Sequence, residues 1–303
     1  MNRPVYVYGA GALGSLLGAL LAHRTAVRLV GRRAHVEAIR RQGGLRVSRT
    51  RPGLYPVAVS EDPQPPPDRA VILVTVKAFD LEEALTQLAP RVDSSHLVVV
   101  LQNGLGIRSL AEHVLERNVV RAVTFMAASL EEPGHVAFNA AGKTYFPANG
   151  EMLELWRRAD MPAVQVDDID TYVWRKLAIN AVINPLSALL GVTNGELLGL
   201  ADLARQLVEE LCRVARNEGQ HLETEETLAK VLASMRQTSR NSSSMLQDVR
   251  AGRQTEIEWI TGVVVRLAEK HGLDVPGHRQ ILELVRFVEQ RRTTAAQVEG
   301  VPS

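Results

Sequence analysis

Three polar residues near the middle of the chain share a spacing that places them on one side of a helix. Lys176, Asn180 and Asn184 recur at every fourth position of WRKLAINAVINPL, so an α-helix would carry them on one stripe that turns by about 40° per step. The residues between them are mostly apolar, which predicts a largely buried helix. Burying such a polar side chain without a partner costs about 1–3 kcal/mol. A ligand-lined cleft would explain that cost, and a satisfied internal polar network is the alternative.

A proline and a predicted turn follow this stripe. Pro185 lacks a helical N–H and pushes Asn184 away from the helical conformation, so we expect a kink or a break there. The sequence TNGE then predicts a turn into the next helix. Taken alone, Asn194 in that sequence would be an ordinary turn residue.

A later segment, NSSSMLQDVRAGRQTEIEWI, supplies further polar candidates. Asn241 and Ser244 lie at an expected helix start, where Asn and Ser are also natural N-caps. Glu256 is a candidate acid, although TEIEWI offers two acids on different faces and Glu256 could equally be a surface carboxylate. From Ser244 to Gly272 the apolar periodicity predicts one long helix.

A glycine-rich loop near the N-terminus predicts a dinucleotide site. Gly9, Gly11 and Gly14 follow a predicted strand and open a predicted helix, with Ala10, Ala12 and Leu13 between them. Gly9 permits a tight turn, Gly11 lets a pyrophosphate approach the backbone, and Gly14 lets the helix pack closely on the strand. The helix N-terminus then faces the phosphates. The alternative is a glycine turn that binds no ligand.

The end of the second predicted strand distinguishes the two nicotinamide dinucleotides. An NAD site normally places Asp or Glu there to bind the ribose diol. The sequence VRLVGRRAHVEAIRR has no acid at that point and offers Arg32 and Arg33 instead. A guanidinium suits a 2′-phosphate, so NADPH is favoured over NADH. The alternative is that both arginines are merely solvated at a helix start.

Two later strand ends add polar groups. Lys77 follows the strand in VILVTVKAFD, and Asn103 follows the strand in LVVVLQNGLG. Ligands of open α/β sheets collect outside the carboxyl ends of strands. Because Asn-Gly is a strong turn dipeptide, Asn103 alone could equally be a turn former.

The first half of the chain alternates short β-branched runs with helical patterns, which predicts βαβ units and a parallel sheet. After Val166 apolar residues recur almost only at helical spacing. We therefore expect an α/β Rossmann-type domain over residues 1–166 and an all-α domain over residues 167–303. The expected elements of the first half are strands at 5–8, 27–30, 70–76 and 97–101 and helices at 13–22, 34–41, 81–88 and 107–115, with less regular strands at 119–128, 135–139 and 144–147.

Composition excludes several classes of protein. Lys and Arg number 35 against 34 Asp and Glu, giving a net charge of +1, which does not fit a nucleic-acid binder. No signal peptide or membrane-spanning stretch is expected, and the single cysteine, Cys212, cannot form an intramolecular disulfide. We expect a cytoplasmic enzyme that is a monomer or homodimer, needs no metal and has no nucleic-acid or membrane partner.

These motifs together resemble the ketopantoate reductase (2-dehydropantoate 2-reductase) family over essentially the whole chain. The matching segments are GAGALG, VTVKAFD, QNGLG, WRKLAINAVINPLSAL, TNGEL and NSSSMLQDVRAGRQTEIEWI. The resemblance implies a Rossmann domain, a helical domain like the C-terminal one of 6-phosphogluconate dehydrogenases, and an active site in the cleft between them. It implies NADPH-dependent reduction of ketopantoate to (R)-pantoate, a step of pantothenate and coenzyme A biosynthesis.

The resemblance also implies roles for single residues. Lys176 matches the catalytic lysine, and Glu256 matches an acid of the active site that also meets the cofactor. Nicotinamide-side cofactor contacts match Lys77, Asn103 and Ala128. The positions that match substrate contacts are Asn103, Lys176, Asn180, Asn184, Asn194, Asn241 and Ser244. Arg32 is preferred over Arg33 for the 2′-phosphate.

The mechanism expected from these parts is a hydride transfer to the C2 carbonyl of the keto acid, with protonation of its oxygen by Lys176. An ammonium can stabilise a developing alkoxide before donating a proton to it. Two alternatives remain at this stage. One is a related NADPH-dependent 2-keto or β-hydroxy acid dehydrogenase of the same architecture, and the other is a redox-sensing module that binds NADPH without turnover.

Overall fold

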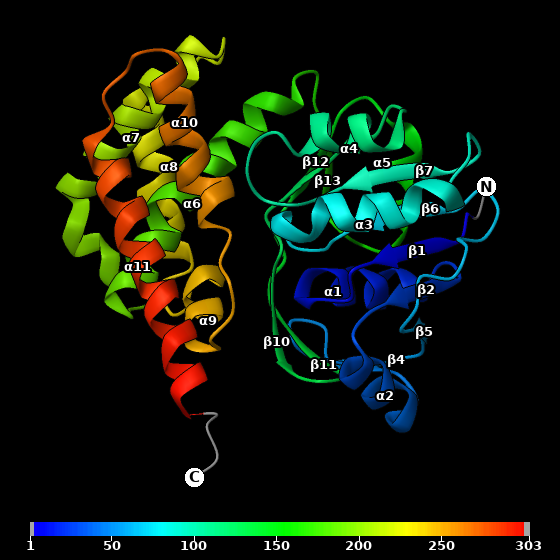
Figure 1. Cartoon of the computed structure of the whole chain (residues 1–303). Helices are drawn as coiled ribbons and strands as arrows, with labels where there is room; N and C mark the ends of the chain where they lie inside the picture. Colours follow the sequence, from blue (N-terminus) through cyan, green and yellow to red (C-terminus); the bar gives the residue numbers. More distant parts are fainter. Residues whose placement is uncertain (1–2, 300–303) are drawn as a thin grey trace. The chain divides into compact units, whose positions relative to one another are not determined.

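The computed structural model describes residues 3–299, with side chains described through residue 291. These residues fold into two compact units, whose elements are labelled in Figure 1. The first unit comprises the chain up to Gln102 together with Gly106–Ile169, and the second comprises Asn103–Leu105 together with the chain after Ile169. Each unit has its own hydrophobic core.

A six-stranded parallel sheet forms the centre of the first unit. Its strands lie in the order β5-β2-β1-β6-β7-β8, and all neighbouring pairs are parallel. They are β1 (Val5–Tyr8), β2 (Val27–Val30), β5 (Ala58–Ser60), β6 (Val71–Val74), β7 (Leu97–Val100) and β8 (Val120–Arg121). β1 and β6 are buried along their whole length, which is typical of β-branched strands covered on both faces.

Four helices connect these strands. They are α1 (Ala12–Ala22), α2 (Arg33–Gln42), α3 (Leu81–Leu88) and α4 (Ile107–Leu115), with short 3₁₀ turns at Ala78–Asp80 and Ala89–Arg91. α1 contacts β1 and β2 on one side and strands of a second sheet on the other. Its leucines, such as Leu16 and Leu17, are fully buried, and each contributes roughly 1.5–3 kcal/mol of hydrophobic stabilisation.

Two smaller sheets complete the first unit. One has the strand order β10-β11-β3-β4 and the other the order β13-β12-β9. Their strands are β3 (Leu45–Arg49), β4 (Gly53–Tyr55), β9 (Val123–Thr124), β10 (Ala127–Glu132), β11 (His135–Ala140), β12 (Thr144–Phe146) and β13 (Ala163–Gln165). Helix α5 (Gly150–Arg158) begins at Asn149, whose side chain accepts a hydrogen bond from the Met152 amide. The sequence did not predict α5, β3, β4, β5 or β13.

The second unit is built from helices around one core. They are α6 (Ile169–Leu190), α7 (Ala201–Asn217), α8 (Thr224–Gln237), α9 (Ser244–Arg250), α10 (Val263–Lys270) and α11 (Pro276–Glu299), with a 3₁₀ helix at Glu196–Leu200 and a π-helical turn at Glu258–Gly262. α7 packs against α8, α10 and α11, and its Leu207, Val208 and Leu211 are fully buried. The predicted fold class, a Rossmann-type α/β domain followed by an all-α domain, is confirmed.

The single long helix predicted from Ser244 to Gly272 is wrong. α9 ends at Arg250, and the chain becomes irregular until the turn that begins at Glu258. Gly252 adopts a left-handed conformation with φ +64°, and the Arg253 amide donates to the Asp248 carbonyl at 2.9 Å. These features close a helix C-terminus. Apolar residues keep their helical spacing across this irregular segment, so the sequence pattern did not indicate the break.

The break considered at Pro185 does not occur, because α6 continues through this residue to Leu190. A proline removes only one helical hydrogen bond. The residues around it, such as Val182 and Leu186, are buried in the core of the second unit. Packing therefore holds the last turns of α6 in place.

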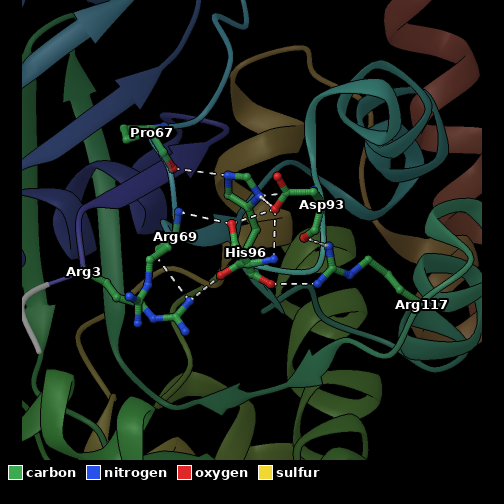
Figure 2. Close-up of polar contacts among 7 residues, drawn as sticks. Arg3, Pro67, Arg69, Asp93, His96 and Arg117 are labelled. Carbon is green, nitrogen blue, oxygen red and sulfur yellow. Dashed lines mark hydrogen bonds and ion pairs between the residues drawn. The ribbon is translucent and has the colours of Figure 1, made fainter.

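A network of side chains holds the edge of the parallel sheet where its strands begin (Figure 2). Arg3 donates to the Ser95 carbonyl at 2.8 Å, and Arg117 donates to the His96 carbonyl at 2.7 Å. The His96 ring lies 2.9 Å from an Asp93 carboxylate oxygen. This network joins the turn before β7 to the segments before β1 and β8, at the end of the strands opposite to the glycine-rich loop.

No helix within the described part of the chain is both long enough and apolar enough to cross a membrane.

Candidate active site

The glycine-rich loop after β1 has the geometry that its sequence predicts. Gly9 has φ +112°, and a Cβ there would lie 2.5 Å from the Val76 amide nitrogen. A Cβ on Gly14 would lie 2.3 Å from the Gly9 carbonyl oxygen, whereas a Cβ on Gly11 would meet nothing within 4 Å. Gly9 and Gly14 are therefore needed for the turn and for close packing, and the space beside Gly11 is open to a ligand.

The loop leads directly into α1, which has Gly11 as its N-cap and no side-chain cap. The amides of the first helical turn have no partner within the helix, so they can bind an anion. Ala10 is buried, and Ala12 and Leu13 are half-buried against the core of the first unit. The open face of the loop is therefore lined by backbone rather than by large side chains.

Thr75, which the sequence analysis did not single out, fixes this loop. Its Oγ1 donates to the Gly9 carbonyl at 2.8 Å, and its amide donates to the Tyr8 carbonyl at 2.9 Å. Thr75 is a polar residue just past the buried strand β6, and that position could have identified it.

The two arginines after β2 have different surroundings. Arg32 is the N-cap residue of α2 and is exposed. Arg33 is also exposed, but its guanidinium donates to Glu37 at 2.7 Å. Gly31 lets the chain pass close to the loop, because a Cβ there would lie 2.7 Å from the Ala10 Cβ.

Lys77 follows β6 and is half-buried at the start of a 3₁₀ turn that ends in Asp80. Burial raises the pKa of the Asp80 carboxyl, and the nearby charges of Arg32 and Lys77 oppose that increase. The first unit therefore gathers two cations and one acid at the carboxyl ends of β2 and β6. Ala128 lies elsewhere, at a bulge of β10, half-buried against the core.

Helix α6 carries the polar stripe of the second unit. Lys176 and Asn180 are half-buried, and Asn184 is buried. One turn farther along, the Ser187 hydroxyl contacts the Asn184 carbonyl at 3.3 Å and also pairs with the Ser243 hydroxyl. The predicted spacing on one helix is therefore present, and the stripe ends in a buried polar contact.

Asn103 and Glu256, which are far apart in the sequence, meet in the second unit. The Asn103 amide Nδ2 donates to the Glu256 carboxylate at 3.2 Å. Glu256 is only 5% exposed, so it is not a surface carboxylate. Gly104, the residue after Asn103, has φ +91° and lies against the backbone of Trp259.

Asn194 and Asn241 are also brought together. The Asn194 amide donates to the Asn241 carbonyl at 3.0 Å, and the Asn194 side chain donates to the Thr238 hydroxyl at 2.9 Å. The Asn194 side-chain oxygen is buried without a hydrogen-bond partner among the described residues. Asn194 therefore belongs to a folded loop rather than to a simple exposed turn.

The residue that caps α9 is Ser243, whose hydroxyl accepts a hydrogen bond from the Leu246 amide at 3.1 Å. Asn241 is half-buried before this cap, and Ser244 is exposed in the first helical turn. The capping role that the sequence offered to Asn241 and Ser244 is thus taken by their neighbour, which the run of serines could have indicated.

The second unit therefore offers an ammonium group, a buried carboxylate and several amide and hydroxyl groups. Such a set can bind a small polar ligand by hydrogen bonds and can move a proton. Within the described residues, no group of three or more His, Cys, Asp or Glu side chains could hold a metal ion.

Both halves of the chain match one protein family. Residues 5–151 match the family described as ketopantoate reductase PanE/ApbA, and residues 168–289 match its C-terminal domain. The 2-dehydropantoate 2-reductase of Archaeoglobus fulgidus is 37% identical over 297 residues, which cover 94% of this chain and 97% of that protein. The enzyme of the same name from Halobacterium salinarum is 34% identical, over 94% of this chain and 99% of that protein.

Solved structures show the same fold. A ketopantoate reductase of the PanE/ApbA family from Ralstonia eutropha superposes with a TM-score of 0.88 at 30% identity, covering 96% of this chain and 100% of that one. A D-mandelate dehydrogenase solved with NADH and anilino(oxo)acetate also gives a TM-score of 0.88, at 25% identity, covering 96% of this chain and 99% of that one. The family resemblance seen in the sequence is thus confirmed. The chain belongs to the ketopantoate reductase (PanE/ApbA) family of oxidoreductases.

Proposed function

We propose that this protein reduces 2-dehydropantoate (ketopantoate) to (R)-pantoate with NADPH. The observation that carries the proposal is the similarity to proteins named 2-dehydropantoate 2-reductase over 94% of the chain, at up to 37% identity. The site geometry supports it. The helical unit carries a half-buried lysine, a buried glutamate and several amide and hydroxyl side chains, groups that suit a small polar substrate.

The first unit is assigned the cofactor, which supplies a hydride when bound. The fit rests on the loop Gly9–Gly14, where the backbone beside Gly11 is open and the amides of the first turn of α1 would be free to bind the phosphates. Arg32 would bind the 2′-phosphate, because Arg33 already pairs with Glu37. The further cofactor contacts in this proposal are Ala10, Ala12, Leu13, Lys77, Asn103, Ala128 and Glu256.

The second unit is assigned the proton transfer. Lys176 would donate a proton to the substrate oxygen, and its ammonium would stabilise negative charge on that oxygen beforehand. Glu256 would act beside it as the acidic partner. The amide of Asn103, 3.2 Å from Glu256, would hold the carboxylate in a fixed orientation.

The substrate contacts follow the same assignment. Ser244, exposed in the first turn of α9, would bind the substrate carboxylate together with Asn241 and Asn194. Asn180 and Asn184 would bind the hydroxyl at C4. A site that pairs a substrate hydroxyl rejects an analogue without it by about 10⁴-fold or more. Specificity for ketopantoate would then arise from the α6 stripe.

A second candidate function is reduction of another 2-keto acid with NADH. The D-mandelate dehydrogenase structure, with its bound NADH and a TM-score of 0.88, favours this alternative because the fold there accommodates both a different substrate and a different cofactor.

Initial rates of cofactor oxidation test the proposal. We expect ketopantoate with NADPH to give the highest kcat/KM. We expect 2-ketoisovalerate, which lacks the hydroxymethyl group that carries the C4 hydroxyl, to be turned over about 10⁴-fold less efficiently. A preference for an aryl 2-oxo acid with NADH would instead support the second candidate. No oxidation of either cofactor with any 2-oxo acid would contradict both.

A further inference from the structure

The segment Asn103–Leu105 packs as part of the helical unit, although its neighbours in the sequence belong to the sheet unit. Leu105 packs against the core of the helical unit. A Cβ on Gly104 would lie 2.3 Å from the Trp259 carbonyl oxygen and 3.0 Å from the Trp259 carbonyl carbon. Real Cβ atoms essentially never approach so closely, so a side chain cannot fit here unless the backbone of Trp259 moves.

Trp259 lies in an unusual turn. Glu258–Gly262 is a π-helical turn that leads directly into α10. The amides of Trp259 and Ile260 both donate to the Glu256 carbonyl, at 3.0 and 3.1 Å. π-helical turns are rare and occur frequently at functional sites. The backbone that Gly104 contacts is therefore hydrogen-bonded directly to the backbone of Glu256.

Asn103 contacts the same turn at a second point. Its amide donates to the Glu256 carboxylate at 3.2 Å, and Glu256 is almost fully buried. Two consecutive residues therefore contact the segment Glu256–Trp259. Gly104 packs against the Trp259 backbone, and Asn103 donates a hydrogen bond to the Glu256 side chain. A shift of Gly104 would move both contacts together.

We propose that Gly104 is a positioning residue, whose missing side chain lets its backbone seat the Glu256–Trp259 turn and so fixes the Glu256 carboxylate. The proposal rests on the proposed function for its effect on turnover, but not for its structural part. The Asn-Gly pair would then have a role beyond turn formation. The glycine is required by the contact with Trp259 as well as by its positive φ angle.

The neighbouring Gly106 provides a matched control. It also has a positive φ, +76°, but a Cβ there would meet nothing within 4 Å. Replacing either glycine by alanine imposes a similar backbone strain. Only Gly104→Ala also forces a collision with Trp259, so the difference between the two variants isolates the contact.

The test combines hydrogen exchange with steady-state kinetics on the full chain. For Gly104→Ala we expect the amides of residues 256–262 to lose protection by at least about tenfold, and kcat with ketopantoate to fall by about 10²-fold. The ratio of the KM for NADPH to the KM for NADH should stay unchanged, because Arg32, rather than this turn, is the proposed partner of the 2′-phosphate. Gly106→Ala should retain wild-type protection in that segment and a wild-type kcat. Wild-type behaviour of Gly104→Ala, or equal losses in both variants, would overturn the proposal.

Asn103→Ala keeps the proposal testable if Gly104→Ala does not fold. It retains the contact between Gly104 and Trp259, so protection of residues 256–262 should be unchanged while kcat falls. Loss of protection in Asn103→Ala would show that the amide, rather than Gly104, holds the turn, and would overturn the inference. If the wild-type enzyme does not reduce ketopantoate, the proposed function fails, whereas the exchange data still decide the role of Gly104.

Discussion

Arg32 and Arg33 are adjacent in the sequence but differ in their surroundings, because the Arg33 guanidinium pairs with the Glu37 carboxylate of the same helix. Such an exposed pair adds little stability, but it holds the Arg33 guanidinium along α2. Arg32 lies at the N-cap, beside the glycine-rich loop through the close approach of Gly31 to Ala10. At the scale of single residues, this difference supports the proposal that Arg32, rather than Arg33, binds the 2′-phosphate of NADPH.

Replacing Arg32 by alanine should therefore change cofactor preference. A charge-assisted hydrogen bond contributes about 1.5–3 kcal/mol, so we expect the dissociation constant of NADPH to rise by about 10- to 100-fold and that of NADH to stay nearly constant. Arg33→Ala is the control and should affect neither. Fluorescence titration measures both constants, and equal losses for the two cofactors in Arg32→Ala would contradict the assignment.

Single residues of the site were predictable to different degrees. Gly9 and Gly14 could be predicted because each has a steric requirement that only glycine meets. Thr75 was missed although its position just past β6 was a signal, because threonines are common at strand ends. Its hydrogen bond to the Gly9 carbonyl depends on how β6 lies beside β1. The contact between Asn103 and Glu256 needs residues from distant parts of the chain, which no local pattern reveals.

At the scale of secondary-structure elements, the start of α11 is fixed by a buried charge on α7. Glu210 is 2% exposed and accepts hydrogen bonds from the Gly277 amide at 2.9 Å and the His278 amide at 3.0 Å. Its carboxylate also contacts the His278 ring and the Gln206 amide. Burial alone would raise the pKa of Glu210, but these hydrogen bonds, led by the one from His278, lower it to about 2. A negative charge at a helix N-terminus is also favourable.

Glu210→Gln should consequently destabilise the helical unit. Glutamine keeps the shape but loses the charge, and it places an amide group where donors already point, so we expect a loss of about 2–3 kcal/mol in the free energy of unfolding. The exposed neighbour Glu209 is the control, and Glu209→Gln should change stability by less than about 0.5 kcal/mol. Urea denaturation measures both values. Equal stability of the two variants would show that the buried carboxylate contributes nothing.

The helices and strands were predicted best where a single pattern of apolar residues runs along the whole element. The strands at Val5–Tyr8 and Val27–Val30 and the helix at Leu81–Leu88 have the predicted bounds. The break between α9 and the turn at Glu258 was missed because apolar periodicity continues through it, whereas the chain is interrupted by the left-handed Gly252. The small strands β3, β4 and β13 were missed because they depend on pairing with distant segments.

At the scale of the whole molecule, the two units contain buried groups that respond to different pH ranges. In the first unit, His35 bridges the Ser15 hydroxyl and the Gly134 amide, each at 3.0 Å. Burial lowers the pKa of His35 below its ordinary value of 6.5. Because the folded state favours the neutral ring, its stabilisation is complete above pH 6.5 and is lost as the pH falls below it. The contribution of Glu210 is lost only between pH 4.5 and about 2.

Acidification from pH 7.5 to 5 should therefore weaken the first unit before the second. We expect hydrogen exchange in α1 and α2 to accelerate over this range, while exchange in α7 and α11 stays constant after correction for its intrinsic pH dependence. His35→Gln should remove most of the change in the first unit. Simultaneous loss of protection in both units, or a response unaffected by His35→Gln, would contradict this account.

Lys176 is the proposed proton donor, and replacing this residue tests the proposed function most directly. Loss of a general acid typically lowers the rate by about 10²- to 10⁴-fold, so Lys176→Ala should lower kcat for ketopantoate by that factor and leave NADPH binding intact. Lys230→Ala, which removes a half-exposed lysine paired with Glu226, should retain full activity. A wild-type kcat in Lys176→Ala, measured by NADPH oxidation, would contradict the central claim.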